Sequence, residues 1–179
     1  SKLDNIERYV QSLSMTIDNF RDFYKPSKEK RLVTINDSIK QALDIVETSM
    51  HTKSISITKE YNSTIELELF THELMQVILN LLKNSQDNFE EKMTEEPAIG
   101  VITNDIKNGI SVEISDNGGG IPEDIQDKIF DPYFSTKTEK NGTGLGLYMS
   151  KLIVEEHHNG KLICQNTNNG VRFTIEIYI

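Results

Sequence analysis

Hydrophobic residues near the start of the chain recur at alternating intervals of three and four positions. The series is Leu3, Ile6, Val10, Leu13, Ile17, Phe20 and Tyr24. A mean spacing of about 3.5 residues places these side chains on one narrow stripe of a helix, which is typical of packing against another helix. We therefore expect a coiled-coil or bundle helix over residues 3–24. Pro26 ends it, because proline disfavours helical backbone at the preceding residue.

The rest of the chain alternates between helical and strand periodicity. Residues 35–50 and 71–93 each carry the wide apolar face of a helix that packs on a globular core. The segments whose apolar and polar residues alternate, or that form short apolar runs, are expected to be strands. These segments are residues 54–58, 64–69, 98–106, 110–115, 161–165 and 171–179. A short helix is expected after Pro122, and a longer one over about 144–157. From residue 33 onward, the pattern predicts a mixed α/β fold with layered helices and sheet.

Composition narrows the possible ligands and surroundings. The 179 residues include 19 Lys and Arg against 28 Asp and Glu, so the formal net charge is −9. An acidic chain without a basic block is a poor match for nucleic acid, whose phosphates require basic surface. No apolar run approaches the roughly 20 residues of a membrane span, so we expect no membrane contact. The single cysteine, Cys164, cannot form an internal disulfide, which favours a reducing, cytoplasmic compartment.

Three polar residues share one stripe of the helix expected over 71–93. Asn80, Asn84 and Asp87 stand at positions i, i+4 and i+7. A solvated face is the ordinary explanation, but such a face favours Lys and Glu, and asparagine is a poor helix former. An amide oxygen is a hard, neutral ligand that suits Mg²⁺ already carrying phosphate oxygens. The stripe is therefore a candidate ligand site.

Two glycine-rich segments could also carry chemistry. Residues 116–122 read D-N-G-G-G-I-P directly after an expected strand, where Asp116 could accept a hydrogen bond from an amine. A simple turn is the alternative, although three glycines exceed what a hairpin requires. Residues 141–147 read N-G-T-G-L-G-L before a helix, where free N–H groups favour an anion. Together an amide for Mg²⁺, a carboxylate for an amine and a glycine loop for phosphates describe a site for a purine nucleoside triphosphate.

In order and spacing, these segments resemble the ATP-binding catalytic domain of two-component sensor histidine kinases. The N box corresponds to residues 74–85, L-M-Q-V-I-L-N-L-L-K-N-S, and the F box to 129–137, I-F-D-P-Y-F-S-T-K. The two glycine boxes correspond to 116–122 and 142–147. Residues 13–26 resemble the second helix of the dimerisation and phosphoacceptor hairpin in nitrogen-regulation-like kinases. Four ordered boxes make the resemblance specific.

The resemblance implies a Bergerat-type two-layer α/β sandwich preceded by a long helix. Residues 1–26 would be the second helix of the dimerisation hairpin, 27–32 a linker and 33–179 the ATP-binding domain. It further implies a homodimer formed through residues 3–24 in the full-length protein. The implied partner is a response regulator receiver domain, and the expected location is cytoplasmic, with an anchor of the parent protein in the inner membrane left open.

The resemblance also assigns roles to individual residues. Asp116 would bind the adenine amine and Asn84 would ligate Mg²⁺. Asn80 and Lys137 would act at the phosphates and are the expected catalytic residues. A lid around 131–146 would close over the triphosphate. The residues assigned to the nucleotide are Asn84, Asp87, Asp116, Gly118, Gly120, Ile121, Phe134, Gly142, Thr143, Gly144, Leu145 and Gly146.

The histidines depart from the family pattern. The H-E-x-x-x-P-like box that carries the phosphoacceptor does not occur in this sequence, and we interpret His72 as a surface or packing residue. His157 and His158 end a helix, where an imidazole is expected to be partly cationic, and neither has the spacing of a metal ligand. We therefore expect the chain to bind ATP and to phosphorylate a histidine located elsewhere.

Two alternatives remain from the sequence. ATPases of the gyrase, mismatch-repair and chaperone type share the fold, but they place a glutamate base four residues before the metal-ligating asparagine. Here that position is Asn80, which cannot accept a proton, so slow hydrolysis is expected. A non-catalytic nucleotide-binding dimerisation module is the other alternative, and the four intact boxes argue against it.

Overall fold

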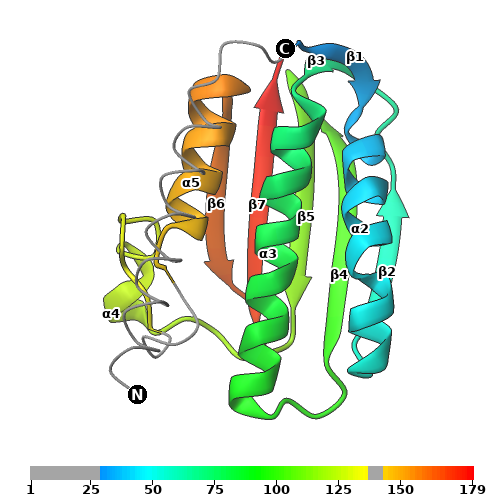
Figure 1. The fold of residues 1–179 in the computed structure, drawn as a ribbon. Helices are drawn as coiled ribbons and strands as arrows, with labels where there is room; N and C mark the ends of the chain where they lie inside the picture. The colour runs from blue at the N-terminus through cyan, green and yellow to red at the C-terminus, as the bar shows by residue number, and fades with distance from the viewer. Residues whose placement is uncertain (1–28, 137–142) are drawn as a thin grey trace, which may run out of the picture.

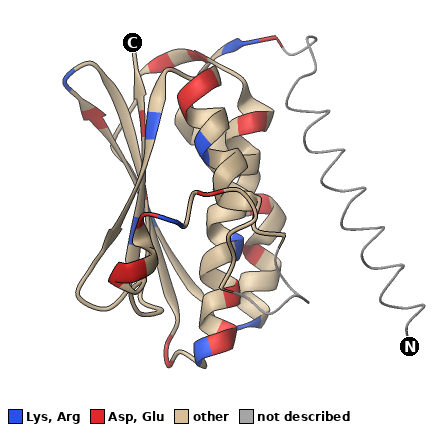
Figure 2. Cartoon of the chain, turned by 90° about the vertical axis from the view of Figure 1, so that its left-hand side faces the viewer, with Lys and Arg blue, Asp and Glu red and all other residues tan. Residues whose placement is uncertain are grey.

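The computed structural model describes residues 29–136 and 143–179 of the chain. The helix expected over 3–24 lies outside these residues. The described part forms two layers, a mixed sheet of five strands and a layer of helices on one face of it (Figure 1). Seen edge-on in Figure 2, the sheet and the helical layer stand side by side. The two-layer α/β sandwich expected from the sequence is confirmed.

The sheet has the order β2-β4-β5-β7-β6. Its strands are β2 (Ser56–Tyr61), β4 (Ala98–Ile106), β5 (Gly109–Asp116), β7 (Val171–Tyr178) and β6 (Gly160–Asn166). β2 runs parallel to β4, and every other neighbouring pair is antiparallel. Along β5 and β7, apolar residues that face the helices alternate with polar residues that face away, as the period of two requires.

The helical layer consists of α2 (Ile35–Thr52), α3 (Thr71–Lys92) and α5 (Gly146–Leu152). α2 and α3 confirm the long apolar periodicities, and the apolar face of α3 is fully buried against the sheet. The short α4 (Glu123–Gln126) follows Pro122 as expected. No described helix is long and apolar enough to cross a bilayer.

Two details differ from the sequence analysis. Residues Arg31–Thr34 form strand β1, which pairs with β3 (Glu66–Leu69), although residues up to 32 were expected to be linker. Four residues are too few to show the alternation of apolar and polar side chains that is typical of a strand. β1 is stabilised by its hydrogen bonds to β3, which the local sequence does not reveal. The helix expected over 144–157 begins at Gly146 and changes after Leu152 to a π-helical turn, Ile153–His157.

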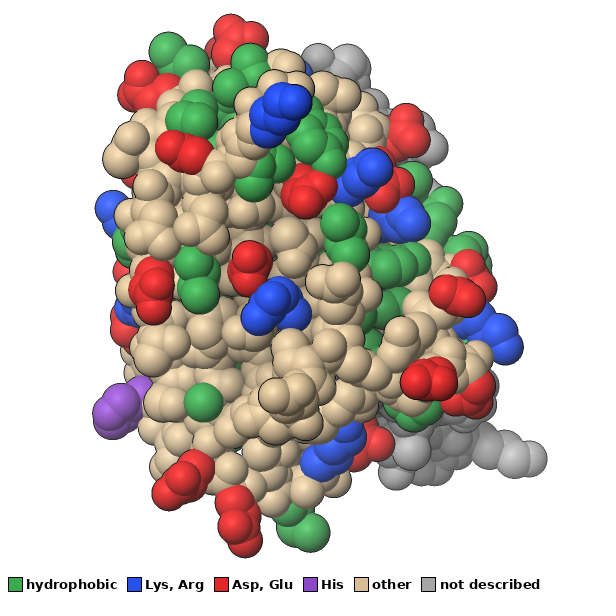
Figure 3. Space-filling model, turned by 180° about the vertical axis from the view of Figure 1, so that it is seen from behind, with side chains coloured by type: hydrophobic (Ala, Val, Ile, Leu, Met, Phe, Trp, Pro, Cys, Tyr) green, Lys and Arg blue, Asp and Glu red, His purple; other side chains and the backbone are tan. Residues whose placement is uncertain are grey.

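The other face of the sheet is not covered by any described helix, and Figure 3 shows it from outside. Its side chains include Glu113 and Arg172, whose ion pair measures 3.2 Å between carboxylate oxygen and guanidinium nitrogen. Ser115 and Thr174 also lie on this face, since they pair with Arg172 and Glu113 in the register of β5 and β7. The buried apolar residues form one core cluster between the two layers.

Candidate nucleotide site

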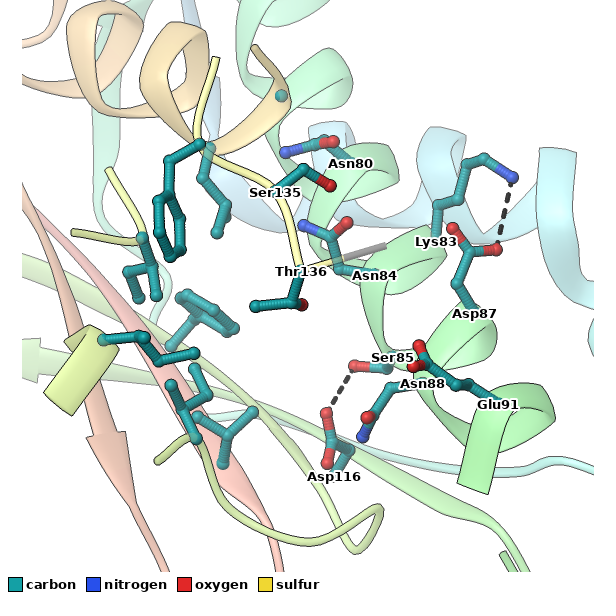
Figure 4. Close-up of a pocket in the computed structure, with 18 of the residues that line it drawn as sticks. Asn80, Lys83, Asn84, Ser85, Asp87, Asn88, Glu91, Asp116, Ser135 and Thr136 are labelled. Atoms are coloured by element: carbon teal, nitrogen blue, oxygen red, sulfur yellow. Dashed lines mark hydrogen bonds and ion pairs between the residues drawn. The ribbon is translucent and has the colours of Figure 1, made fainter. Parts of the chain in front are cut away.

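A pocket of about 530 Å³ lies between α3, the loop after β5 and the segment before α5. Figure 4 shows the polar side chains of α3 along one wall and apolar side chains along the opposite wall. The lining residues that were assigned to the nucleotide or its chemistry are Asn80, Asn84, Asp87, Asp116, Gly120, Ile121, Phe134, Thr143, Gly144 and Gly146. Segments far apart in the sequence therefore meet around one cavity.

The α3 wall is polar because the stripe opposite the buried face of the helix points into the pocket. Asn80, Asn84 and Asn88 follow one another at intervals of four residues and all line the cavity. Asp87 also lines it, and its carboxylate lies 3.4 Å from Lys83 Nζ. The three asparagines of this stripe therefore face a cavity, where a ligand could reach them.

At the base of the pocket, the Asp116 carboxylate is buried, with 7% of the residue exposed. Ser85 Oγ donates a hydrogen bond of 2.7 Å to Asp116 Oδ2, and the Gly118 N–H donates one of 3.0 Å to Oδ1. An ionised carboxylate offers about four acceptor positions, so two donors leave capacity for another. Asp116 is thus oriented by the protein and still able to accept an N–H from a ligand.

The wall opposite α3 is apolar. It is formed by Ile121, Ile125, Ile129, Phe134, Leu147, Val171 and Phe173. An apolar wall beside one oriented carboxylate is suited to a flat heteroaromatic ring that carries an exocyclic amine, because the ring faces bury apolar area and the amine meets the acceptor.

At the other end of the pocket, two glycines lie close to neighbouring groups, one to backbone and the other to a side chain. Gly144 has φ of 66°, and a Cβ there would lie 2.4 Å from the carbonyl carbon of Tyr133. A Cβ at Gly146 would lie 2.4 Å from Asn80 Oδ1. Asn80 Nδ2 in turn donates a 3.0 Å hydrogen bond to Ser150 Oγ on α5. Only glycine fits at position 144, where φ is positive and the close atoms are backbone, whereas a side chain at position 146 would displace the Asn80 amide that joins α3 to α5.

Some residues assigned from the sequence lie elsewhere. Gly118 does not line the cavity but packs behind it, where its carbonyl oxygen accepts a 2.9 Å hydrogen bond from Asn88 Nδ2. Leu145 is buried, with 2% exposed, and does not line the pocket. Lys137 and Gly142 lie outside the described residues, so their assignment to the phosphates stays a prediction.

Other residues of the site were missed from the sequence. Asn88 continues the asparagine stripe by one more turn, and the same spacing rule could have found it. Ser85 is part of the N box, but only its bond to Asp116 shows what it does. Asn166 contacts the glycine loop across 45 positions of sequence, for which no local pattern gives a signal.

The histidines form a separate group at the start of α3. His158 is buried, its Nε2 accepts the Phe70 N–H at 3.2 Å, and its Nδ1 lies 2.9 Å from the Ile153 carbonyl oxygen. Burial lowers the pKa of His158, so the expected partly cationic imidazole is wrong at this position. His157 Nδ1 lies 2.9 Å from Glu73 Oε2, and His72 is exposed, as expected of a surface residue. Residues 29–136 and 143–179 contain no group of three potential metal-binding side chains of the His, Cys, Asp or Glu type.

Comparison with known proteins gives one coherent result. Residues 71–179 match the model of the family described as histidine kinase-, DNA gyrase B- and HSP90-like ATPase. Sensor histidine kinase ZraS of Escherichia coli (strain K12) is 30% identical over 165 residues, which cover 91% of this chain and 34% of ZraS. Sporulation kinase A of Bacillus subtilis (strain 168) is 28% identical over 98% of this chain and 27% of its own length. The chain thus spans about a third of the length of the curated relatives it matches.

Solved structures give the same picture. The catalytic domain of histidine kinase ThkA, in a nucleotide-free form, superposes with a TM-score of 0.73 at 31% identity, covering 84% of this chain and 95% of that domain. ThkA in complex with the response regulator protein TrrA superposes with a TM-score of 0.71 at 26% identity, covering 97% of this chain and 50% of that one.

Proposed function

Because the chain belongs to the histidine kinase-, DNA gyrase B- and HSP90-like ATPase family, and within it to the histidine kinase catalytic domains, we propose a specific reaction for its pocket. The pocket binds ATP with Mg²⁺ and directs the γ-phosphoryl group to a histidine on a dimerisation helix outside this sequence. The phosphoryl group then passes to an aspartate of a response regulator receiver domain.

The observation that carries the proposal is the buried, oriented Asp116 carboxylate facing an apolar wall. Asp116 would accept the adenine amine, and Ile121 and Phe134 would cover the faces of the ring. The triphosphate would then extend along α3 toward Asn84 and Asn80, where Gly144 and Gly146 bring backbone close to the ligand.

The α3 residues fit Mg²⁺ bound together with phosphates. Mg²⁺ keeps several waters and takes only one or two ligands from the protein, with phosphate oxygens supplying others. The Asn84 amide oxygen is such a ligand, and the Asp87 carboxylate lies one turn away on the same wall. Bound there, Mg²⁺ would neutralise charge on the phosphates, a contribution that Lys137 is proposed to share.

The identity of residue 80 favours transfer to histidine over hydrolysis. Water requires a general base, but an amide cannot accept a proton at neutral pH, and Asn80 Nδ2 is already donating to Ser150. A neutral imidazole is itself a nucleophile and needs only to be positioned in line with the γ-phosphoryl group. The ATPase alternative therefore lacks a base at residue 80.

The proposed partners follow from the family. ThkA forms a complex with a response regulator, and we propose that this chain acts with a receiver domain in the same way. We also propose that residues 3–24 form a homodimeric bundle in the full-length protein, because their heptad stripe requires a helical partner. A cytoplasmic location is proposed, since ATP and reduced Cys164 belong in that compartment.

Phosphotransfer from labelled ATP tests the proposal. The chain is incubated with ATP carrying a radioactive γ-phosphate and with a separate dimerisation hairpin that bears the phosphoacceptor histidine. We expect acid-labile, alkali-stable label on the hairpin, and none on a hairpin whose histidine is replaced by alanine. Release of the label only as inorganic phosphate would support the ATPase alternative instead.

A further inference from the structure

The loop after β5, which forms the adenine end of the pocket, rests on the turn between β6 and β7. The Gly119 N–H donates a 2.9 Å hydrogen bond to the Asn169 carbonyl oxygen. A Cβ at Gly170 would lie 1.7 Å from the Asp116 carbonyl oxygen, so the turn packs directly against the backbone of Asp116. Asp116 is the residue proposed to bind the adenine amine. The turn is therefore the support on which this loop is held.

One side chain in this support binds the loop through both ends of its amide. Asn166 Oδ1 accepts the Ile121 N–H at 2.8 Å, and Asn166 Nδ2 donates to the Ile121 carbonyl oxygen at 2.8 Å. The side-chain amide thus pairs with the backbone of Ile121 as a neighbouring strand would. Ile121 lines the pocket, whereas Asn166 lies behind it.

The neighbouring residues fit around this pair of bonds. A Cβ at Gly120 would lie 2.9 Å from Asn166 Cγ and Oδ1, so a side chain at position 120 would displace the amide. Three other side chains also bind the loop, namely Asn88 to the Gly118 carbonyl oxygen at 2.9 Å, Gln126 to the Ile121 carbonyl oxygen at 3.1 Å and Lys92 to the Gly120 carbonyl oxygen at 3.4 Å. Asn166 has only two rotatable side-chain bonds, so it holds Ile121 at a lower entropic cost than the longer Gln126 does.

We propose that Asn166 is a positioning residue for the nucleotide: by pairing with Ile121 it fixes the wall against which the adenine ring packs. This inference rests on the proposed function. Asn166 is exposed, and hydrogen bonds at such a site contribute little to overall stability. Its effect is on the pocket, because a loop that is already ordered loses less conformational freedom when the ligand binds.

Substitution at residue 166 tests the proposal by nucleotide affinity. For Asn166→Ala we expect Kd to rise about three- to tenfold for both ATP and ADP, because the contact lies at the base and not at the phosphates. KM for ATP should rise in phosphotransfer with little change in kcat. Asn166→Asp keeps the side-chain volume but turns a carboxylate toward the Ile121 carbonyl oxygen, so it should also lose affinity.

The matched control is Asn168→Ala, because Asn168 is exposed in the same turn and has no side-chain hydrogen bond within the described residues. It should leave affinity unchanged. The proposal would be overturned if Asn166→Ala bound ATP with unchanged affinity, or if Asn168→Ala lost as much affinity. It would also be overturned if Asn166→Ala had a lower melting temperature but the folded protein bound ATP normally.

Amide hydrogen exchange provides a second measurement that does not depend on nucleotide. In Asn166→Ala the Ile121 amide should exchange at least about tenfold faster, while the amides of β5 and β7 keep their protection. Unchanged exchange at Ile121 would overturn the inference. Failure of the wild-type chain to bind ATP would instead refute the proposed function, so the two failures are distinguishable.

Discussion

At the scale of single residues, the recognition of the base depends on how the Asp116 carboxylate is held. Ser85 donates to one oxygen and the Gly118 N–H to the other, so the carboxylate cannot rotate freely. Both interactions come from residues that the sequence marks only as members of a motif. The orientation of Asp116, more than its charge alone, is what would distinguish an amine from a carbonyl group on the base.

Ser85→Ala should weaken the discrimination between purines. ATP carries an exocyclic amine where inosine triphosphate carries a carbonyl oxygen, so the wild-type chain should prefer ATP. Loss of the 2.7 Å bond frees one carboxylate oxygen, and we expect the preference, measured as the ratio of the two Kd values, to fall about three- to tenfold. An unchanged ratio would show that Ser85 does not orient Asp116.

Asn84→Ala should separate nucleotide binding from metal binding. The adenine end of the pocket is unaltered, so some affinity for ATP remains, but the amide ligand is lost. We expect the enhancement of ATP affinity by Mg²⁺ to fall about tenfold or more in calorimetric titrations with and without the ion. Persistence of the full Mg²⁺ dependence would contradict the role of Asn84.

Asn80→Glu should increase hydrolysis, because it adds the base that the ATPases of this fold possess. A well-placed general base increases the rate of such a reaction by about 10²–10⁴-fold. Asn80 Oδ1 lies so near Gly146 that a longer side chain cannot be placed ideally, and we expect roughly a tenfold rise in phosphate release. Asn80→Gln is the control of equal length, and the same rate in both variants would leave the role of residue 80 without support.

The residues that could be identified from the sequence are those whose type is unusual in its setting. Asparagines on a helix stripe and an aspartate before three glycines stand out because other residues would be more stable there. Ser85 and Asn166 are ordinary polar residues, and their partners lie 31 and 45 positions away. Such contacts depend on the tertiary fold, so no local pattern could reveal them.

At the scale of elements, the long helices with a periodic apolar face could be predicted from the sequence. A short strand that depends on its pairing partner, and an irregular turn of helix, could not. α2 and α3 span 18 and 22 residues, enough turns to show an apolar face. β1 has four residues and exists through its pairing with β3. The π-helical turn after α5 coincides with the contact between His158 and the Ile153 carbonyl oxygen, which the apolar pattern does not encode.

The contact between this turn and α3 makes stability depend on pH. His158 accepts the N–H of Phe70, the residue that caps α3, and burial lowers its pKa below that in the unfolded chain. The unfolded chain therefore takes up a proton that the native chain does not, in the window from about pH 6.5 down to the lowered native pKa. The contribution of His158 is complete above pH 6.5 and declines as the pH falls through this window.

His158→Phe should remove this dependence and destabilise the fold by about 1–3 kcal/mol, because the Phe70 N–H loses its acceptor. Urea unfolding between pH 5 and 8 measures both effects. His51→Gln is the control for the removal of a histidine, since His51 is exposed on α2. A variant at residue 158 with the wild-type dependence on pH would contradict this explanation.

At the scale of the whole molecule, an acidic chain is proposed to bind a polyanion. The net charge is −9, and Figure 2 shows the positions of acidic and basic residues interspersed along the described part of the chain. Part of the α3 wall of the pocket is neutral, because it presents the amides of Asn80, Asn84 and Asn88. These amides do not repel phosphate groups as carboxylates would. Net charge therefore limits non-specific binding of polyanions without preventing a specific site.

The two-layer arrangement explains why the site stands where it does. The helices of the described residues cover one face of the sheet (Figure 1), and β5 ends at Asp116, which accepts a hydrogen bond from Ser85 of α3. The N-box helix and the two glycine segments are separated in the sequence but converge on the same end of this layer. The order of the N box and the two glycine boxes is visible in the sequence. Their convergence on one pocket depends on the tertiary fold, including the strand order β4-β5-β7.

The central claim is that the pocket beneath α3 binds ATP through Asp116. Calorimetric titration of ATP with Mg²⁺ into the wild-type chain and Asp116→Asn tests it most directly. Asparagine preserves the shape but loses the charge and one acceptor, so we expect saturable 1:1 binding by the wild type and a Kd at least about tenfold higher for the variant. Equal affinity of the two proteins for ATP, or no binding by the wild type, would contradict the claim.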